Sequence, residues 1–188
     1  MGYTPEKKAL KKKQPKSSPF AGLKENWDQK KPVVFFVLGF VVLMVLFYIL
    51  LLSEFFQNSM QVHIIATDAK ISSFILNLFG VNTLANKEMI SSPEFSISIA
   101  RGCDGLEAMA LFLSALLSFP AKWKFKLVGF FGGLAILFSL NIVRVVSLYL
   151  IGLHYPKAFE FMHVEVWQVI FIIFAIGLWI FWIRWTRK

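Results

Sequence analysis

Cysteine is almost absent from this chain, because the 188 residues contain only one, Cys103. A single thiol excludes an intramolecular disulfide and any fold that depends on one. Charged residues are also scarce, at 16%, against about a quarter in an average soluble domain. Histidine occurs three times, without the spacing typical of a zinc site. The sequence therefore predicts no metal site and no cofactor.

Apolar residues are abundant instead, at 57% of the chain, and phenylalanine alone occurs 21 times. A soluble domain of this size has too little interior for so much aromatic surface. The long apolar runs predict an all-α polytopic membrane protein with about four transmembrane helices. The runs are residues 33–52, 106–119, 127 to about 153, and 166–183. A polar tail of about thirty residues precedes the first run, so we interpret that run as a retained signal anchor.

The basic residues gather in three places: residues 1–31, residues 121–126 and the last five residues hold 15 of the 20 Lys and Arg. The positive-inside rule places these segments, and therefore both termini, in the cytoplasm. We predict a basic cytoplasmic tail over 1–31 and a single membrane-embedded domain over 32–188. Because an apolar run follows the tail at once, its expected contact is lipid headgroups rather than nucleic acid.

Two segments, residues 53 to about 104 and 154 to about 165, then lie on the extracytoplasmic side. Within the first, residues 64–79 carry apolar side chains at helical spacing, which predicts a helix on the membrane face. In residues 89–100, apolar residues alternate with serine after a Ser-Pro-Glu turn. This pattern predicts a small β-hairpin leading toward Cys103.

Cys103 lies in the stretch Arg101-Gly102-Cys103-Asp104-Gly105, just before the second apolar run. A helix that starts there offers free N–H groups and the positive end of its dipole, and a nearby arginine acts in the same direction. We therefore expect the pKa of the thiol to be lowered. The two glycines permit a tight turn. The alternative interpretation is an inert, buried cysteine.

Arg144 interrupts the third apolar run about 26 Å from its start, near the outer boundary of the hydrocarbon. Asn141 precedes it by three residues and forms a polar stripe with it. A charge at this depth generally faces the protein interior or a water-filled cavity. The alternatives are that Arg144 reaches the outer headgroups, or that it pairs with Glu107 or Asp104 for structural reasons.

His163 lies three residues before the fourth run, on the same predicted side of the membrane. His154 competes with it as a proton shuttle, and His63 is a weaker candidate. A thiolate nucleophile, an imidazole for proton transfer and a guanidinium for a developing oxyanion together form a set for acyl transfer. Cys103, His163 and Arg144 supply these groups from three separate segments.

These residues resemble the exosortase/archaeosortase family: Cys-Asp-Gly-Leu at 103–106 opens a span, Asn141-x-x-Arg144 lies in the next, and His163 precedes the last. The resemblance covers about residues 33–185 and is greatest to the subtype exosortase H. It implies a cysteine peptidase or transpeptidase with catalytic Cys103, Arg144 and His163. Supporting or substrate-binding residues are then Asn141, Asp104, Glu107 and Arg101. Many relatives have serine where this chain has Asp104, and this acid would either orient His163 or Arg144 or oppose thiolate formation.

The resemblance also implies the partners. Substrates would be membrane-anchored proteins with a C-terminal sorting signal, which consists of a short motif, a transmembrane helix and a basic tail. Cleavage would form a thioester at the extracytoplasmic face of the bacterial inner membrane, with possible transfer to an acceptor. The alternative function is a non-enzymatic assembly or helix-binding subunit that uses a groove at Arg144. A transporter with Arg144 in an anion path is disfavoured because we find no internal repeats.

Overall fold

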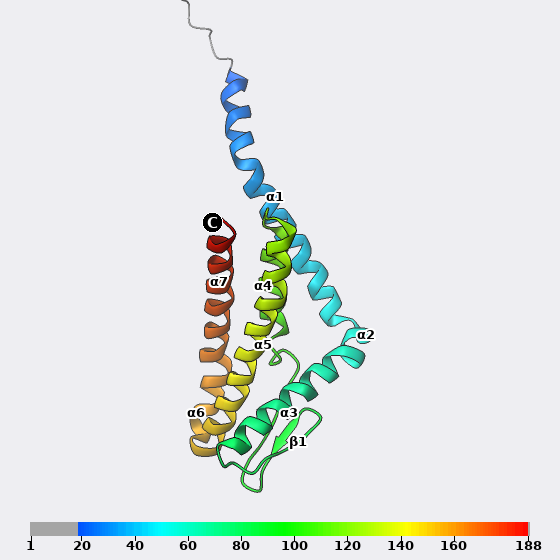
Figure 1. The fold of residues 1–188 in the computed structure, drawn as a ribbon, viewed down its shortest axis with the longest axis vertical. Helices are drawn as coiled ribbons and strands as arrows, with labels where there is room; N and C mark the ends of the chain where they lie inside the picture. Colours follow the sequence, from blue (N-terminus) through cyan, green and yellow to red (C-terminus); the bar gives the residue numbers. More distant parts are fainter. Residues whose placement is uncertain (1–18, 188) are drawn as a thin grey trace, which may run out of the picture. The chain divides into compact units, whose positions relative to one another are not determined.

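The computed structural model describes the backbone of residues 19–187 and the side chains of residues 30–187. Most of the basic tail predicted for residues 1–31 lies outside the described side chains. The chain divides into two units at Phe35 and Phe36, and every element of the candidate site lies in the second unit. Helix α1 (Pro19–Leu52) runs through this boundary (Figure 1).

Three helical stretches of the described chain are long and apolar enough to cross a membrane: Lys30–Leu52 in α1, α5 (Trp123–His154), and the continuous stretch Pro156–Thr186. The last combines α6 (Pro156–Phe161), the π-helical turn η2 (Met162–Val166) and α7 (Trp167–Thr186). Helix α4 (Leu106–Ser118) is apolar too, but its 13 residues rise only about 20 Å. The predicted helical membrane architecture is confirmed, with the second predicted span shorter than a full crossing of about 30 Å.

Between α1 and the sheet lie α2 (Glu54–Phe56), the π-helical turn η1 (Gln57–Gln61) and α3 (Val62–Leu78). Helix α3 is the amphipathic helix that the apolar spacing predicts. Its large apolar side chains, such as Phe74 and Leu78, are exposed. Its buried face combines Ile65 and Leu76 with small and polar residues, among them Asp68, Ala69 and Ser72. The polar residues point inward because they find hydrogen-bond partners there.

The sheet has three short antiparallel strands in the order β1 (Leu84–Asn86), β2 (Met89–Ser91) and β3 (Ser96–Ser98). Strands β2 and β3 form the predicted hairpin, and Ile90 lies opposite Ile97. In the turn, the hydroxyl of Ser92 accepts a hydrogen bond from the Phe95 N–H at 3.2 Å. Strand β1 was not predicted, because three residues are too few to show an alternating pattern.

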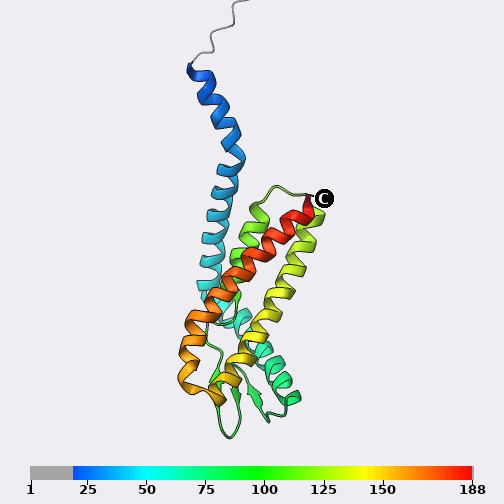
Figure 2. The same ribbon diagram turned by 90° about the vertical axis from the view of Figure 1, so that its left-hand side faces the viewer.

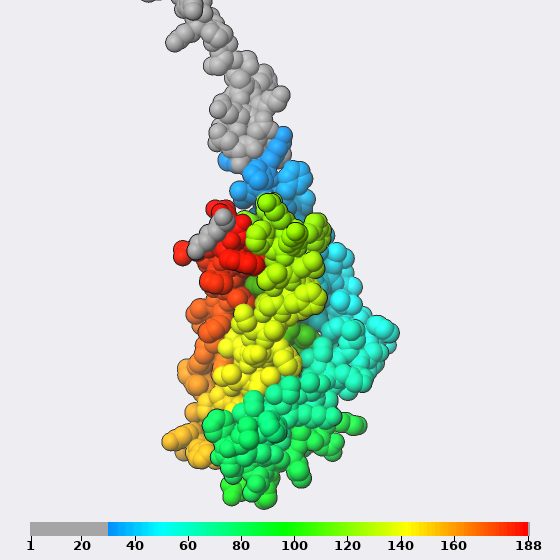
Figure 3. Space-filling model, viewed as in Figure 1, coloured from blue at the N-terminus to red at the C-terminus, as the bar shows by residue number. Residues whose placement is uncertain are grey.

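Helix α5 is the element on which the others assemble. Helix α3 and the sheet pack against its C-terminal part through a core that includes Ile90, Ile99 and Tyr149. Figure 3 shows α3 lying against α5 at the surface. Helices α4 and α7 pack against its N-terminal part. There Gly133 allows close approach, since a Cβ at that position would overlap the ring of Phe112. Helices therefore meet at small residues, as is common within membranes.

The second unit has two chemically different ends. At one end, the loop between α4 and α5 lies beside the end of α7, and the guanidinium of Arg187 stands 5.9 Å from the centre of the Phe119 ring. At the other end are α6, the sheet and the turn before α4, as Figure 2 shows. The basic loop 121–126 thus shares its end with the basic C-terminus, while Cys103 and His163 lie toward the opposite end.

Candidate active site

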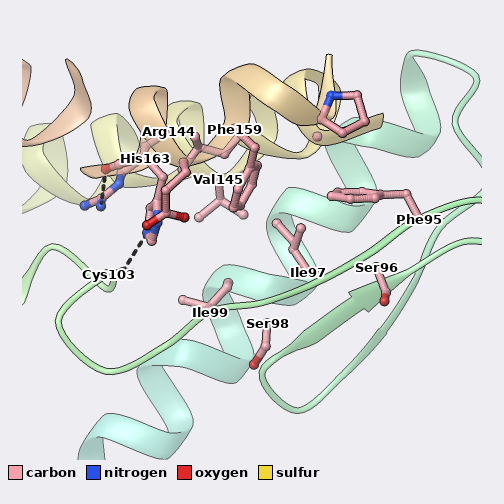
Figure 4. A pocket seen from close by; sticks show the side chains of 14 residues that line it. Phe95, Ser96, Ile97, Ser98, Ile99, Cys103, Arg144, Val145, Phe159 and His163 are labelled. Atoms are coloured by element: carbon pink, nitrogen blue, oxygen red, sulfur yellow. Dashed lines mark hydrogen bonds between the residues drawn. The ribbon is translucent and has the colours of Figure 1, made fainter. Parts of the chain in front are cut away.

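Cys103 and His163 are in contact although 60 residues separate them in the sequence. The Cys103 Sγ atom lies 3.0 Å from His163 Nε2 (Figure 4). Cys103 belongs to the turn between β3 and α4, and His163 belongs to η2. Single π-helical turns within helices often occur at functional sites, because they shift a side chain out of the α-helical repeat. This contact has the geometry of a nucleophile and its general base.

The turn around Cys103 depends on two glycines in the left-handed region of backbone space. Gly102 has φ +86° and Gly105 has φ +73°, which side chains with a Cβ rarely adopt. A Cβ on Gly105 would also lie 3.3 Å from the Asn141 side chain. Helix α4 begins directly after this turn, and its first N–H, from Leu106, donates to the Asp104 carboxylate at 3.2 Å.

The expected lowering of the Cys103 pKa is wrong. Burial raises the pKa of the thiol, the Arg144 guanidinium opposes that shift, and the carboxylates of Asp104 and Glu107 add to it. Asp104 also occupies an N–H at the start of α4 that the sequence analysis assigned to the thiol. The group placed to take the thiol proton is His163, whose Nε2 lies 3.0 Å from the sulfur.

Arg144 is only 7% exposed and lies beside the histidine. Its Nη2 donates to the main-chain carbonyl of His163 at 3.5 Å, and its guanidinium stands 5.5 Å from the centre of the Phe171 ring. Its Nε is buried without a hydrogen-bond partner. In the part of the chain with described side chains, Arg144 has no ion pair with Glu107 or Asp104, so the structural pairing considered from the sequence is not formed. The guanidinium keeps a free donor at the site.

A buried polar network lies behind these residues. Asn141 is fully buried, and its amide donates to the carboxylate of Asp68, which also accepts a hydrogen bond from Ser72 at 3.3 Å. Gln61 donates to the Asp104 carboxylate at 2.6 Å. The expectation that Asp104 orients His163 or Arg144 is thus not met, because its hydrogen-bond donors are Gln61 and the start of α4.

The sequence analysis missed Gln61 and Asp68 as part of this site. Both lie on the buried face of η1 and α3, seven residues apart, with Ser72 four residues further. This spacing places all three on one side of a helix. The signal was therefore present as a polar stripe, opposite the apolar side chains that indicated a membrane-facing helix.

Two cavities meet at Arg144. The first has a volume of about 500 Å³ and is lined by Cys103, Arg144 and His163 together with residues 95–99. The second, of about 240 Å³, is lined by α1, α4 and α7 and again by Arg144. One cavity contains the thiol and the imidazole, and the other lies among the membrane helices.

The comparison with known families bears on the whole second unit. Residues 32–181 match the transmembrane exosortase family (Exosortase_EpsH). The chain belongs to this family. Membership makes the protein a membrane protein and suggests a membrane-bound sorting transpeptidase of the cysteine class. No curated protein and no solved structure matches the chain.

Of the remaining candidates in this exosortase family member, several form no hydrogen bond with the thiol among the described residues. Arg101 is exposed and donates from Nη1 to the Gln57 side chain at 2.7 Å. Glu107 is exposed and lines the second cavity. His154 is exposed, and its Nδ1 contacts the Leu150 carbonyl at 2.9 Å. His63 likewise contacts the main chain of its own segment. Among the side chains of residues 30–187, no group of three or more His, Cys, Asp or Glu is placed to hold a metal ion.

Proposed function

We propose that this protein is a membrane cysteine peptidase or transpeptidase that cleaves the C-terminal sorting signals of membrane-anchored proteins. The observation that carries the proposal is the 3.0 Å contact between Cys103 Sγ and His163 Nε2. That contact lies at a cavity which Arg144 also lines. Family membership favours the same class of reaction.

The reaction begins with transfer of the Cys103 proton to His163 Nε2 as the sulfur attacks the substrate carbonyl carbon. A C–S bond forms, and the carbonyl oxygen becomes an oxyanion. The protonated His163 then gives its proton to the leaving amine as the C–N bond breaks, which leaves a thioester on Cys103. Water or an acceptor nucleophile attacks the thioester and restores the thiol.

Arg144 stabilises the oxyanion in this mechanism. Its Nη2 donates to the main chain of His163, which holds the guanidinium at the site. Its buried Nε is a donor without a partner, and the Arg144 side chain lines the cavity at the thiol. A preorganised donor in a water-poor site contributes strongly to acyl transfer, because it needs no rearrangement when charge develops.

The transmembrane helix of the substrate lies against α1, α4 and α7 and places side chains in the second cavity. This cavity is lined by mostly apolar residues of those helices, and Arg144 lines both it and the cavity at the thiol. A helix lying there would bring the residues just outside its end to Cys103. The clustering of basic residues at the other end of the second unit favours a cytoplasmic position for that end. The reaction then takes place on the extracytoplasmic side of a bacterial inner membrane, with both termini in the cytoplasm.

The test uses reporter proteins that carry an exported domain, a randomised ten-residue segment, a leucine-rich membrane helix and a lysine-rich end. The library is co-expressed with the wild type and with Cys103→Ala, and processing is followed by the size of the reporter. We expect the wild type to process a subset of reporters and Cys103→Ala to process none. Mass spectrometry of the quenched wild type should show a reporter fragment joined to Cys103 as a thioester.

Arg101→Ala is the matched control, because this exposed arginine lies two residues from the thiol and makes no contact with it. It should process reporters at the wild-type rate. Normal processing by a fully inserted Cys103→Ala protein would exclude the covalent mechanism. Reporter binding without processing by the wild type would instead favour the non-enzymatic assembly subunit.

A further inference from the structure

The outer edge of β3 has backbone groups that the sheet does not use. Strand β3 pairs only with β2, and the Ile99 N–H donates to the Glu88 carbonyl at 2.9 Å. In an antiparallel ladder, alternate residues direct both backbone groups to the same neighbour, so Ile97 also faces β2. The N–H and C=O groups of Ser96 and Ser98 therefore point to the opposite edge. Among the described residues, these groups have no hydrogen-bond partner.

This unused edge opens into the cavity that contains the thiol. All five residues 95–99 line that cavity. Figure 4 shows Ile97 and Ile99 pointing to one side of the strand, toward Val145, and Ser96 and Ser98 pointing to the other. Neighbouring residues of a strand point their side chains to opposite faces. They line one cavity together when that cavity runs along the edge of the strand, where the backbone groups are accessible. The same cavity is lined by Cys103 and His163.

We propose that the substrate segment next to the scissile bond binds as an added strand on the outer edge of β3. This inference rests on the proposed function and names how its substrate is held. An exposed strand edge is a template for another extended chain, and proteins generally cover or protect such edges. An extended peptide supplies alternating C=O and N–H groups, which pair with the unused backbone groups of Ser96 and Ser98. Only three residues separate Ile99 from Cys103, and both line the same cavity, so a peptide on this edge leads to the sulfur.

The walls of the cavity define the side chains that fit. Every second residue of the added strand would point to the side of Ile97 and Ile99, where Val145 and Leu148 of α5 and Phe159 of α6 line the cavity. This side favours apolar residues, whereas the side of Ser96 and Ser98 has no such wall. The substrate is therefore an extended segment with apolar residues at alternate positions, ahead of its membrane helix.

Ser98→Pro tests the edge directly. Proline removes the outward N–H and leaves the β2–β3 ladder intact, and edge strands tolerate proline. Ala85→Pro is the matched control, because Ala85 has the same outward position on β1 at the far edge of the sheet. With a reporter that the wild type processes, we expect Ser98→Pro to lower the rate about tenfold, the cost of about one backbone hydrogen bond. Ala85→Pro should process within about twofold of the wild type.

A second measurement does not depend on cleavage. Cys103 is the only cysteine, so Cys103→Ala combined with Ser98→Cys has a single thiol at the edge. The probe is a library reporter that co-purifies with the Cys103→Ala protein, with one cysteine moved through its ten-residue segment and disulfides formed with copper phenanthroline. We expect crosslinks at alternate reporter positions. Equal crosslinking at every position, no crosslinking, or no co-purifying reporter would overturn strand addition.

The two proposals fail in different ways. A reporter that crosslinks at alternate positions but is not cleaved by the wild type refutes the peptidase mechanism and leaves strand addition standing. A reporter that Ser98→Pro and the wild type cleave equally well refutes strand addition and leaves the peptidase mechanism standing. Alkylation of Cys103 at the wild-type rate checks that each proline variant retains its fold.

Discussion

The side-chain amide of Asn141 donates a hydrogen bond to the buried carboxylate of Asp68, and this contact joins α5 to α3 one helical turn before Arg144. Both side chains are fully buried. Burial raises the pKa of Asp68 from 3.8 to about 6, hydrogen bonds from Asn141 and Ser72 oppose the shift, and the Asp104 charge adds to it. The contact fixes how α5 is rotated against α3, and therefore where Arg144 stands at the site.

Asp68→Asn should change how stability depends on pH. In the unfolded chain the carboxyl titrates near 3.8 and in the folded protein near 6, so the folded state binds the extra proton between these values. The contribution of Asp68 to the free energy of unfolding is therefore greatest at low pH. It falls by roughly 3 kcal/mol as the pH rises through 4 to 6. Asparagine keeps an oxygen for Asn141 but does not titrate. We expect the variant to lose less thermal stability than the wild type between pH 5 and pH 7.5 in detergent.

The exposed residue Glu94 provides the control for this experiment. Glu94→Gln should follow the wild type at both pH values, because a solvated carboxylate gains little from folding. An equal loss of stability in Asp68→Asn and the wild type would contradict the buried, titrating carboxyl.

His163→Ala should slow alkylation of Cys103 at neutral pH. Burial raises the pKa of this thiol, so the sulfur needs the imidazole 3.0 Å away to lose its proton near pH 7. We expect iodoacetamide to react at least about tenfold more slowly with the variant at pH 7, and the two rates to converge above about pH 10. Mass spectrometry measures the reaction without interference, because the chain has no other cysteine.

His154→Ala is the matched control for this prediction, because the exposed His154 contacts the Leu150 carbonyl and the Tyr155 ring rather than the thiol. Its alkylation profile should match the wild type. A pH profile that is unchanged in His163→Ala would mean that the imidazole does not activate the sulfur.

Much of the architecture follows from the sequence. Long apolar runs identify α5 and the helix ending at Thr186, because a membrane helix must satisfy its backbone internally and leaves a continuous signal. Alternating residues in 89–100 identify the hairpin for a similar reason: one face must be buried. Cys103, Arg144 and His163 were found as rare polar groups next to apolar runs, and the structure brings them together.

The rest depends on contacts between distant segments. The pKa of Cys103 is raised mainly by its burial, which depends on segments that are distant in the sequence. Gln61 and Asp68 are ordinary polar residues in a segment outside the long apolar runs. Their place in the site depends on which face of α3 meets α5. The small residues Ala69 and Ser72 allow close packing and so favour burial of the face of α3 on which they lie. Apolar periodicity alone indicated the large apolar side chains of this helix instead.

Arg144→Lys should impair processing while leaving the protein inserted. Lysine keeps the positive charge that lowers the Cys103 pKa but lacks the planar donors that reach the His163 carbonyl and the substrate. We expect reporter processing to fall by about two orders of magnitude, the effect of losing one oxyanion donor. The pH profile of Cys103 alkylation should change little.

Arg144→Gln separates charge from geometry, because it removes the guanidinium charge. The pKa of Cys103 should then rise further, and alkylation near pH 7 should slow. Arg101→Lys should behave as the wild type in both measurements, since Arg101 is exposed and bound to Gln57. Wild-type processing by Arg144→Lys would show that a point charge is sufficient.

Gly152→Ala should narrow the cavity at the thiol. Gly152 lines that cavity on α5, and a Cβ there would overlap the ring of Phe95. This ring already packs on Tyr149 and Phe159, with centroid distances of 5.4 and 6.4 Å, so it has little room to move except into the cavity.

Gly132→Ala is the control, because nothing lies within 4 Å of its Cβ position on the same helix. Alanine should stabilise the helix at Gly132 by up to about 1 kcal/mol. At Gly152, overpacking should outweigh that gain by about 1 kcal/mol or more, and reporter processing should fall. Thermal unfolding in detergent and reporter processing measure the two effects. Equal gains in stability at the two positions, with unchanged processing, would show that Phe95 does not form a fixed wall of the cavity.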